Sequence, residues 1–118
     1  LVVWCAKRDR GDITVVGWYK HATVWRDLQE WTMVWADGEE EERYYNILAK
    51  ASDCTLLPDS ERNRRIWWVP SAKYTKSYGF GQSMVWYPNE PEAQPYISLL
   101  IDSIENYDGE NWLNKYPE

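Results

Sequence analysis

The chain has 118 residues, of which 44% are hydrophobic and 27% charged, and its formal net charge is −6. This length and balance predict one globular domain over residues 1–118 and argue against a disordered or fibrous chain. No apolar run approaches the roughly 18 residues of a membrane span, and the N-terminus lacks the basic and apolar layout of a signal peptide. We therefore expect a cytoplasmic protein without a membrane partner. Leu1 in place of an initiator Met favours a domain excised from a longer protein.

Strand-like segments dominate the first half of the chain. Residues 1–7 and 12–20 are rich in β-branched and aromatic side chains, and the turn-rich sequence RDRGD joins them, which predicts a hairpin. Residues 23–26 indicate a short strand or the start of a loop. The sequence ADGEEEE, at 36–42, is typical of a polar loop.

The second half predicts more short strands and one helix. The strands are expected at residues 43–51, 54–58, 65–69 and 84–87, with a long loop at 70–83. Pro91 suits the first turn of a helix and Gly109 its end, because apolar side chains recur at helical spacing between them: Ile97, Leu100, Ile101, Ile104 and Tyr107. We expect an α+β fold, with a small twisted, barrel-like sheet of about six strands and flanking helices that include the C-terminal one.

Residue types that carry catalysis are scarce. Cys5 and Cys54 lie in apolar segments, which favours two reduced core cysteines over one disulfide of a secreted protein. His21 is the only histidine, so a metal site built on several histidines is excluded, and no Cys-x-x-Cys spacing or phosphate-binding loop of Walker type is present. The sequence therefore predicts a binding domain that is not an enzyme and uses no metal or cofactor.

The charge is unevenly distributed. Residues 31–60 hold two basic and seven acidic side chains, and residues 91–118 hold one and six, whereas residues 61–90 hold five and two. The five basic side chains alternate with Trp and Tyr: Arg62, Arg64, Arg65, Lys73 and Lys76. Positive groups of this kind contact phosphates, and flat rings stack on bases. The alternative is that the tryptophans belong to the core and the arginines are solvated.

The aromatic composition is unusual, since the chain holds nine Trp and nine Tyr but one Phe. Two distant stretches, VVGWYKHATVWR at 15–26 and GFGQSMVWYP at 79–88, place small residues beside a Trp-Tyr pair. Trp and Tyr offer a stacking face together with a polar edge, which Phe lacks. Two such stretches predict the walls of a pocket for a flat ring.

These stretches, together with YYNILAKASDCTLLP at 44–58, resemble the modified-base-reading domains of the PUA-like superfamily, of the EVE and YTH-like kind, over residues 1 to about 108. The resemblance implies a barrel-like sheet and an aromatic cage that accepts a methylated or hydroxymethylated base flipped out of double-stranded DNA. It also implies a role in a restriction or defence system, with a fused or associated HNH nuclease or McrB-type NTPase. RNA remains open as the target.

The resemblance also assigns residues to roles. Trp18 and Trp86 would be the cage walls, with Tyr19, Tyr87 or Trp25 as a third. The polar edge of the base would be read by Asn46, Gln82, Ser83, His21 and Thr23. The phosphates would be bound by Arg62, Arg64, Arg65, Lys73 and Lys76. Four further tryptophans remain open between core and cage: Trp4, Trp31, Trp35 and Trp112.

Two other binding functions remain in competition. A carbohydrate-binding module would also present Trp and Tyr platforms, and acidic residues would accept sugar hydroxyls. A peptide-binding domain would use a Trp-rich groove for a proline-rich or extended segment. Neither the modified base nor its sequence context follows from the chain.

Overall fold

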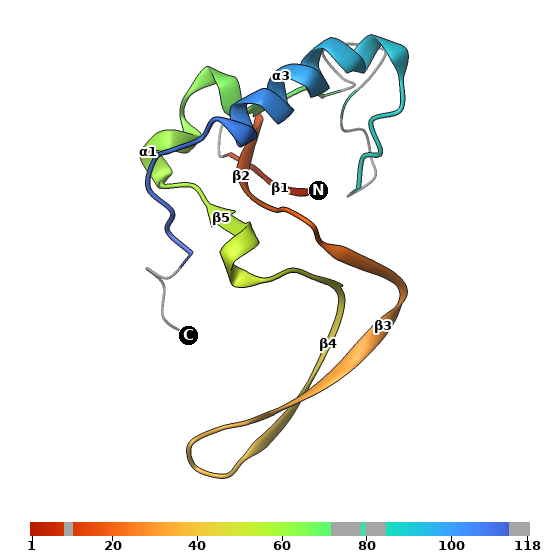
Figure 1. Cartoon of the computed structure of the whole chain (residues 1–118), viewed down its shortest axis with the longest axis vertical. Coiled ribbons are helices and arrows are strands. Elements are labelled where there is room, and N and C mark those ends of the chain that lie inside the picture. Colours follow the sequence, from red (N-terminus) through yellow and green to blue (C-terminus); the bar gives the residue numbers. More distant parts are fainter. Residues whose placement is uncertain (9–10, 72–78, 80–84, 114–118) are drawn as a thin grey trace. The chain divides into compact units, whose positions relative to one another are not determined.

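The computed structural model describes residues 1–8, 11–71, 79 and 85–113. Six strands and a C-terminal helix confirm the α+β class (Figure 1). The strands are β1 (Val2–Lys7), β2 (Ile13–Tyr19), β3 (Thr23–Val34), β4 (Glu40–Leu48), β5 (Cys54–Leu56) and β6 (Trp68–Val69). The helices are α1 (Asp59–Arg62) and α3 (Gln94–Glu105), with short 3-10 turns η1 (Ala51–Asp53), η2 (Arg65–Trp67) and η3 (Pro91–Ala93).

The chain divides into two compact units. The hairpin unit comprises Leu1–Val2 and Trp18–Cys54, and the sheet unit comprises Val3–Gly17 and Thr55–Glu118. The strands of the described residues form one four-stranded and one two-stranded sheet, and no barrel closes among them.

A four-stranded sheet organises the sheet unit. Its order is β1-β2-β5, and β6 also pairs with β2 in antiparallel register, Thr14 opposite Trp68. The predicted first hairpin is confirmed, because the Arg8 N–H donates to the Asp12 carbonyl across 2.7 Å and Gly11 takes the left-handed φ of 93° that such a turn requires. Gly17 brings β2 against β5, where a Cβ would collide with the Thr55 carbonyl oxygen.

The core of this unit is small and partly aromatic. Its buried side chains are Val15, Leu57, Trp67, Ala93, Leu100 and Ile104. Leu100 and Ile104 lie one turn apart on α3, which contacts η2. Tyr107, just beyond α3, packs edge-on against Trp67 with ring centroids 6.0 Å apart. Of the residues at the predicted helical spacing, Leu100 and Ile104 are thus buried, Ile97 and Tyr107 are half-buried, and Ile101 is 41% exposed.

The hairpin unit is built on β3 and β4, which pair antiparallel as a long two-stranded ribbon (Figure 1). The turn between them is tight: the Trp35 N–H donates to the Glu39 carbonyl, and Gly38 has a φ of 86°. This is the three-residue hairpin turn with a left-handed glycine. A bulge interrupts the ladder between Val24 and Gln29.

Two predictions for this hairpin were wrong in extent. The strand expected at residues 23–26 continues to Val34, and the bulge explains the miss because it breaks the period-two pattern of a regular strand. The predicted polar loop at 36–42 is a turn of three residues, and Glu40, Glu41 and Glu42 lie within β4. Their cross-strand partners on β3 hold them in extended backbone despite the low strand propensity of glutamate.

The C-terminal third departs from prediction at two points. Of the strand predicted at 84–87, residues 85–87 are not in a strand and residue 84 lies outside the described residues; the Trp86 Nε1–H donates to the Glu90 carboxylate. The helix ends at Glu105, before Gly109, because the Asn106 side chain donates to the Asp102 carbonyl and caps the last turn.

Candidate functional site

A cluster of arginine and tryptophan side chains lies on the sheet unit. The Arg8 guanidinium lies 5.7 Å and the Arg65 guanidinium 5.5 Å from the centroid of the Trp68 ring. Trp68 is 37% exposed, and Arg65 is exposed as well. We call these three residues the Arg–Trp cluster. A cation lying against a tryptophan ring is attracted by the negative face of that ring.

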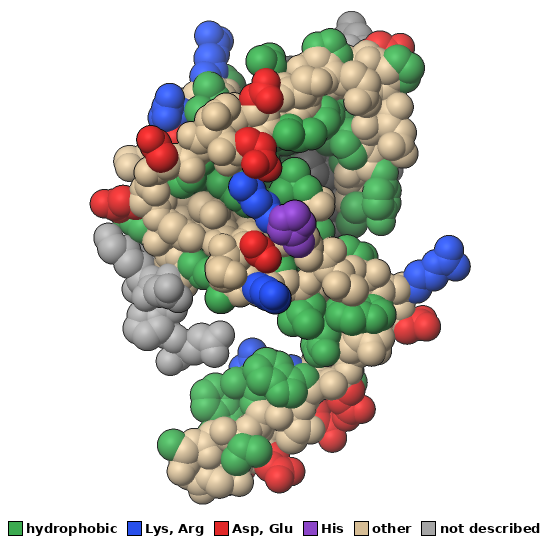
Figure 2. All heavy atoms as spheres, viewed as in Figure 1, with side chains coloured by type: hydrophobic (Ala, Val, Ile, Leu, Met, Phe, Trp, Pro, Cys, Tyr) green, Lys and Arg blue, Asp and Glu red, His purple; other side chains and the backbone are tan. Residues whose placement is uncertain are grey.

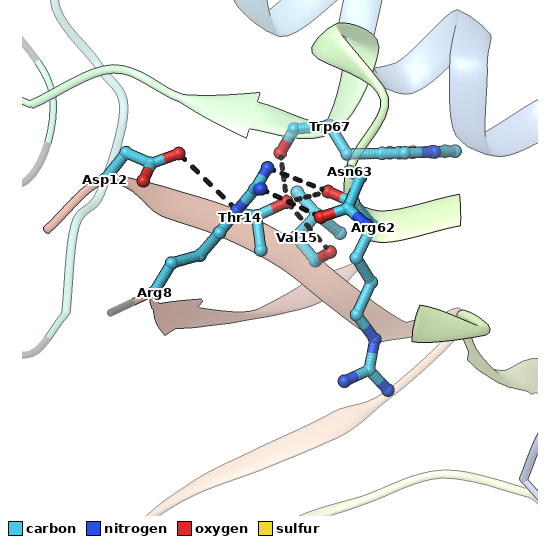
Figure 3. Close-up of polar contacts among 7 residues, drawn as sticks. All are labelled: Arg8, Asp12, Thr14, Val15, Arg62, Asn63 and Trp67. Atoms are coloured by element: carbon cyan, nitrogen blue, oxygen red, sulfur yellow. Dashed lines mark hydrogen bonds and ion pairs between the residues drawn. The ribbon is translucent and has the colours of Figure 1, made fainter. Parts of the chain in front are cut away.

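A network of hydrogen bonds holds the backbone beside this cluster (Figure 3). Arg8 donates to the Asn63 side chain at 2.9 Å and to the Arg62 carbonyl at 3.2 Å, and it pairs with Asp12 at 3.4 Å. The buried Thr14 hydroxyl donates to the same Arg62 carbonyl at 2.9 Å. Arg8, just after β1, and Thr14, in β2, thus fix the start of the segment that runs from Arg62 to Trp68.

Two consecutive tryptophans in this segment have opposite environments. Trp67 is 1% exposed, and its Nε1–H donates to Glu61 at 2.9 Å, whereas Trp68 stands at the surface. Trp67 ends the η2 turn and Trp68 begins β6, so the backbone changes conformation between the two rings and they do not share one environment. Trp68 is thus the ring that is presented to solvent.

The predicted phosphate contacts are only partly available. Arg62 pairs with Asp59 at 3.4 Å, and Arg64 pairs with Glu61 at 2.7 Å. Arg65 takes part in no ion pair among the described residues. Of the three, Arg65 is therefore the one whose charge is not already met by a carboxylate in the described part of the chain, and contact of all three with phosphates stays a prediction. Lys73 and Lys76 lie outside the described residues.

An aromatic pair involves one predicted cage wall. Trp86 is half-buried and stacks on Tyr96, with ring centroids 6.3 Å apart and an interplanar angle of 22°. Burial and the nearby Cys5 raise the pKa of Tyr96, so its hydroxyl stays protonated at neutral pH. That hydroxyl is buried and has no hydrogen-bond partner among the described residues. A buried polar group of this kind is expected to find a partner in water or in a ligand.

The other proposed cage residues lie in varied surroundings. Trp18 is 2% exposed and packs in the hairpin unit as a core residue, so a role as a cage wall would require its ring to gain exposure. Trp25 packs edge-on against Tyr45 at 5.8 Å, Tyr19 is half-buried and Tyr87 is 76% exposed. Because Trp18 and Trp86 belong to different units, their association in one cage stays a prediction.

The residues proposed to read the base edge are scattered among the described elements. His21 lies in the turn after β2 with a φ of 52°, and Thr23 begins β3; both are exposed. Asn46 is exposed on β4, at the level of the bulge. Gln82 and Ser83 lie outside the described residues.

The sequence did not indicate three contributors to these sites. Arg8 lies more than fifty residues before the other members of the cluster in the chain. Tyr96 stacks on Trp86 from α3. The sequence did not show which of the adjacent Trp67 and Trp68 is exposed. The one sequence signal for Arg8 was its position at the start of the predicted turn RDRGD, directly after the first predicted strand. Of the four tryptophans left open, Trp4, Trp31 and Trp35 are exposed and Trp112 is half-buried.

The cysteines are free thiols. Burial raises the pKa of Cys5 to about 11, and burial with the nearby Asp53 raises that of Cys54. Both thiols are therefore protonated at neutral pH, which is unfavourable for a nucleophile. The described residues hold no group of three or more His, Cys, Asp or Glu side chains placed to bind a metal ion. No helix in this part of the chain is long and apolar enough to cross a membrane.

Comparison with family models, curated proteins and solved structures gives no match to this chain.

Proposed function

We propose that this chain is a nucleic-acid-binding module that recognises a modified base in double-stranded DNA. The observation that carries the proposal is the Arg–Trp cluster: an exposed Trp68 ring with two guanidinium groups against it. The proposal includes a PUA-like architecture and a fused or associated nuclease or NTPase, as the sequence resemblance implies. The module binds, and any catalysis belongs to the partner.

The cluster offers both of the interactions that a nucleic acid strand needs. Arg65 provides an exposed charge for a phosphate, and the Trp68 ring provides a face on which a base stacks for about 1–3 kcal/mol. Arg8 is held by Asp12, Asn63 and the Arg62 carbonyl, so little of its side-chain freedom remains to be lost on binding. Arg62 and Arg64 would contribute less, because each already pairs with a carboxylate.

The aromatic pair supports recognition of the base itself. Trp86 and Tyr96 stack, and the protonated Tyr96 hydroxyl, which is buried, would donate to an acceptor on a base edge once binding exposes it. Flipping a base out of the duplex costs a few kcal/mol, which stacking in a pocket offsets. An added methyl group contributes about 0.8 kcal/mol on burial, only a few-fold in affinity. Strong preference for the modified base therefore requires a pocket that the unmodified base fills badly.

Salt dependence separates this function from carbohydrate binding, the strongest alternative. Binding to phosphates releases counterions, so DNA affinity falls steeply with salt, whereas the affinity for a neutral sugar changes little. Replacing Arg65 by Ala should weaken modified and unmodified duplexes alike and reduce the salt slope by about 1, as expected for one lost phosphate contact.

The matched control is Arg43→Ala, which removes an exposed arginine of the hairpin unit that pairs with Glu41. It should leave both the affinity for DNA and the slope unchanged. Fluorescence anisotropy of labelled duplexes at several salt concentrations measures both quantities. If Arg65→Ala behaves as the control does, the Arg–Trp cluster is not the phosphate-binding surface.

A further inference from the structure

The two faces of the β3–β4 hairpin differ in chemistry. Residues directly opposite in an antiparallel pair share a face, and successive residues alternate between faces. Trp31 opposite Arg43 and Gln29 opposite Tyr45 therefore lie on one face, which we call the aromatic face. Glu42, opposite Thr32, and Glu40, opposite Val34, lie on the other, the acidic face.

A groove of about 460 Å³ follows β4. Five of its six lining residues belong to β4 and one to β3: Arg43, Tyr44, Tyr45, Ile47, Leu48 and Trp31. By the alternation along β4, Arg43, Tyr45 and Ile47 lie with Trp31 on the aromatic face, whereas Tyr44 and Leu48 lie on the acidic face. Trp31 is 57% exposed, and Tyr44 and Leu48 are exposed to a similar degree. Figure 2 shows hydrophobic and acidic side chains next to one another on the hairpin, in the lower part of the view.

The acidic charge of the hairpin is largely uncompensated within the described residues. From residue 27 to residue 42 the chain holds seven acidic side chains and no basic one. Arg43 pairs with Glu41 and the Tyr44 hydroxyl donates to Glu42, while neither Glu40 nor Glu42 forms an ion pair with another described residue. Glu40 and Glu42 are two residues apart on one face, so their charges repel each other. A cation brought to this face would relieve that repulsion.

One edge of β4 has no neighbouring strand among the described residues. Within the described part of the chain, β3 is its one sheet partner. A two-stranded hairpin is marginally stable in water, and a third strand with an apolar face is the usual remedy. An outer edge of this kind is a template for a further extended chain.

We propose that the outer edge of β4 docks an extended segment of a partner protein in which apolar and basic side chains alternate. Its backbone would continue the sheet, since alternate side chains of a strand reach opposite faces. The apolar ones would enter the groove beside Trp31, and the Lys or Arg ones would meet Glu40 and Glu42. A second copy of this chain fits less well, because it would bring an equally acidic hairpin against this one.

The direct test uses a fluorescent peptide of nine residues, the length of β4, that alternates valine with lysine. A valine–glutamate peptide of the same length and a lysine peptide with proline at its centre are the comparisons. The lysine peptide should bind best. The proline peptide should lose binding, because proline removes a backbone donor from the new ladder.

Variants locate the site. Glu40→Gln with Glu42→Gln should weaken the lysine peptide about fivefold, as expected for two exposed ion pairs. Trp31→Ala should weaken it about tenfold through loss of the anchor in the groove. The control, Glu92→Gln with Asp102→Asn, removes the same charge from exposed positions of the sheet unit and should change little. Circular dichroism confirms that each variant is folded.

Three results would overturn the proposal. The first is a glutamate peptide that binds as well as the lysine peptide. The second is unchanged binding in both the double glutamine variant and Trp31→Ala. The third is a dimer of the protein in sedimentation equilibrium that Trp31→Ala dissociates, since that would assign the edge to a second copy. None of these measurements involves DNA, so they are independent of the nucleic-acid proposal.

Discussion

Removing the Thr14 hydroxyl tests whether β2 positions the segment that carries the Arg–Trp cluster. Thr14 is 3% exposed, and its hydroxyl has one proton to donate. The Arg62 carbonyl is the nearest acceptor at 2.9 Å, and the Trp67 carbonyl lies farther away at 3.3 Å. Thr14→Val replaces the hydroxyl by a methyl group of similar size and removes this hydrogen bond.

The expected loss of stability follows from the hydrogen bonds that the Arg62 carbonyl keeps after the substitution. A neutral hydrogen bond contributes about 0.5–1.5 kcal/mol, and a buried group left without a partner costs about 1–3 kcal/mol. The Arg62 carbonyl keeps its bond from Arg8, so the larger penalty applies only in part. We expect Thr14→Val to lower the free energy of unfolding by about 1–2 kcal/mol, which is about 4–8 °C in Tm for a chain of this size.

Urea unfolding followed by tryptophan fluorescence and far-UV circular dichroism gives the free energy. Thr14→Ser, which keeps the hydroxyl, should recover part of the loss. Thr32→Val, at an exposed position of β3, should stay within about 0.5 kcal/mol of the parent. A loss below about 0.5 kcal/mol for Thr14→Val would refute the role of this hydroxyl as the fixed point of the segment.

Two further predictions concern the buried side chains near α3 and β1. Tyr96→Phe removes a buried hydroxyl that has no hydrogen-bond partner in the described part of the chain, so the protein should be as stable or up to about 1 kcal/mol more stable in urea unfolding. The same substitution should weaken binding of the modified duplex, and unchanged binding would exclude the hydroxyl from base recognition. In a Cys54→Ser background, alkylation of Cys5 should show a pH midpoint near 11 and not near the ordinary 9.0, with a rate at pH 8 about a hundredfold below that of free cysteine. Because the pKa of Cys5 is higher in the folded state than in the unfolded state, the folded state binds this proton more tightly, and stability should fall as the pH rises from 9 to 11. An alkylation midpoint near pH 9 would contradict the burial of this thiol.

The sequence predicted the elements whose pattern is local. The spacing of Leu100 and Ile104 identified the C-terminal helix and its packed face, and RDRGD identified the first hairpin. The extent of β3 could not be predicted, because the bulge after Val24 removes the alternation on which a strand is recognised. The place of the glutamates in β4 depends on cross-strand pairing with β3, which composition does not show.

The candidate site was predicted only in part for a related reason. The grouping of Arg62, Arg64 and Arg65 follows from their closeness in the chain. Which of them is paired with a carboxylate depends on the turns of α1 and η2. The contribution of Arg8 depends on pairing between strands distant in sequence, and the outward position of Trp68 depends on the change from the η2 turn to β6 between Trp67 and Trp68.

The most direct test of the account is a titration of the protein with matched short duplexes at two salt concentrations, followed by tryptophan fluorescence. One duplex is unmodified, and the others carry 5-methylcytosine, 5-hydroxymethylcytosine or N6-methyladenine. A modified-base reader should bind one modified duplex more tightly, should bind all of them more weakly at the higher salt, and should lose the preference in Trp86→Ala. Equal and negligible binding to every duplex would contradict the proposed function.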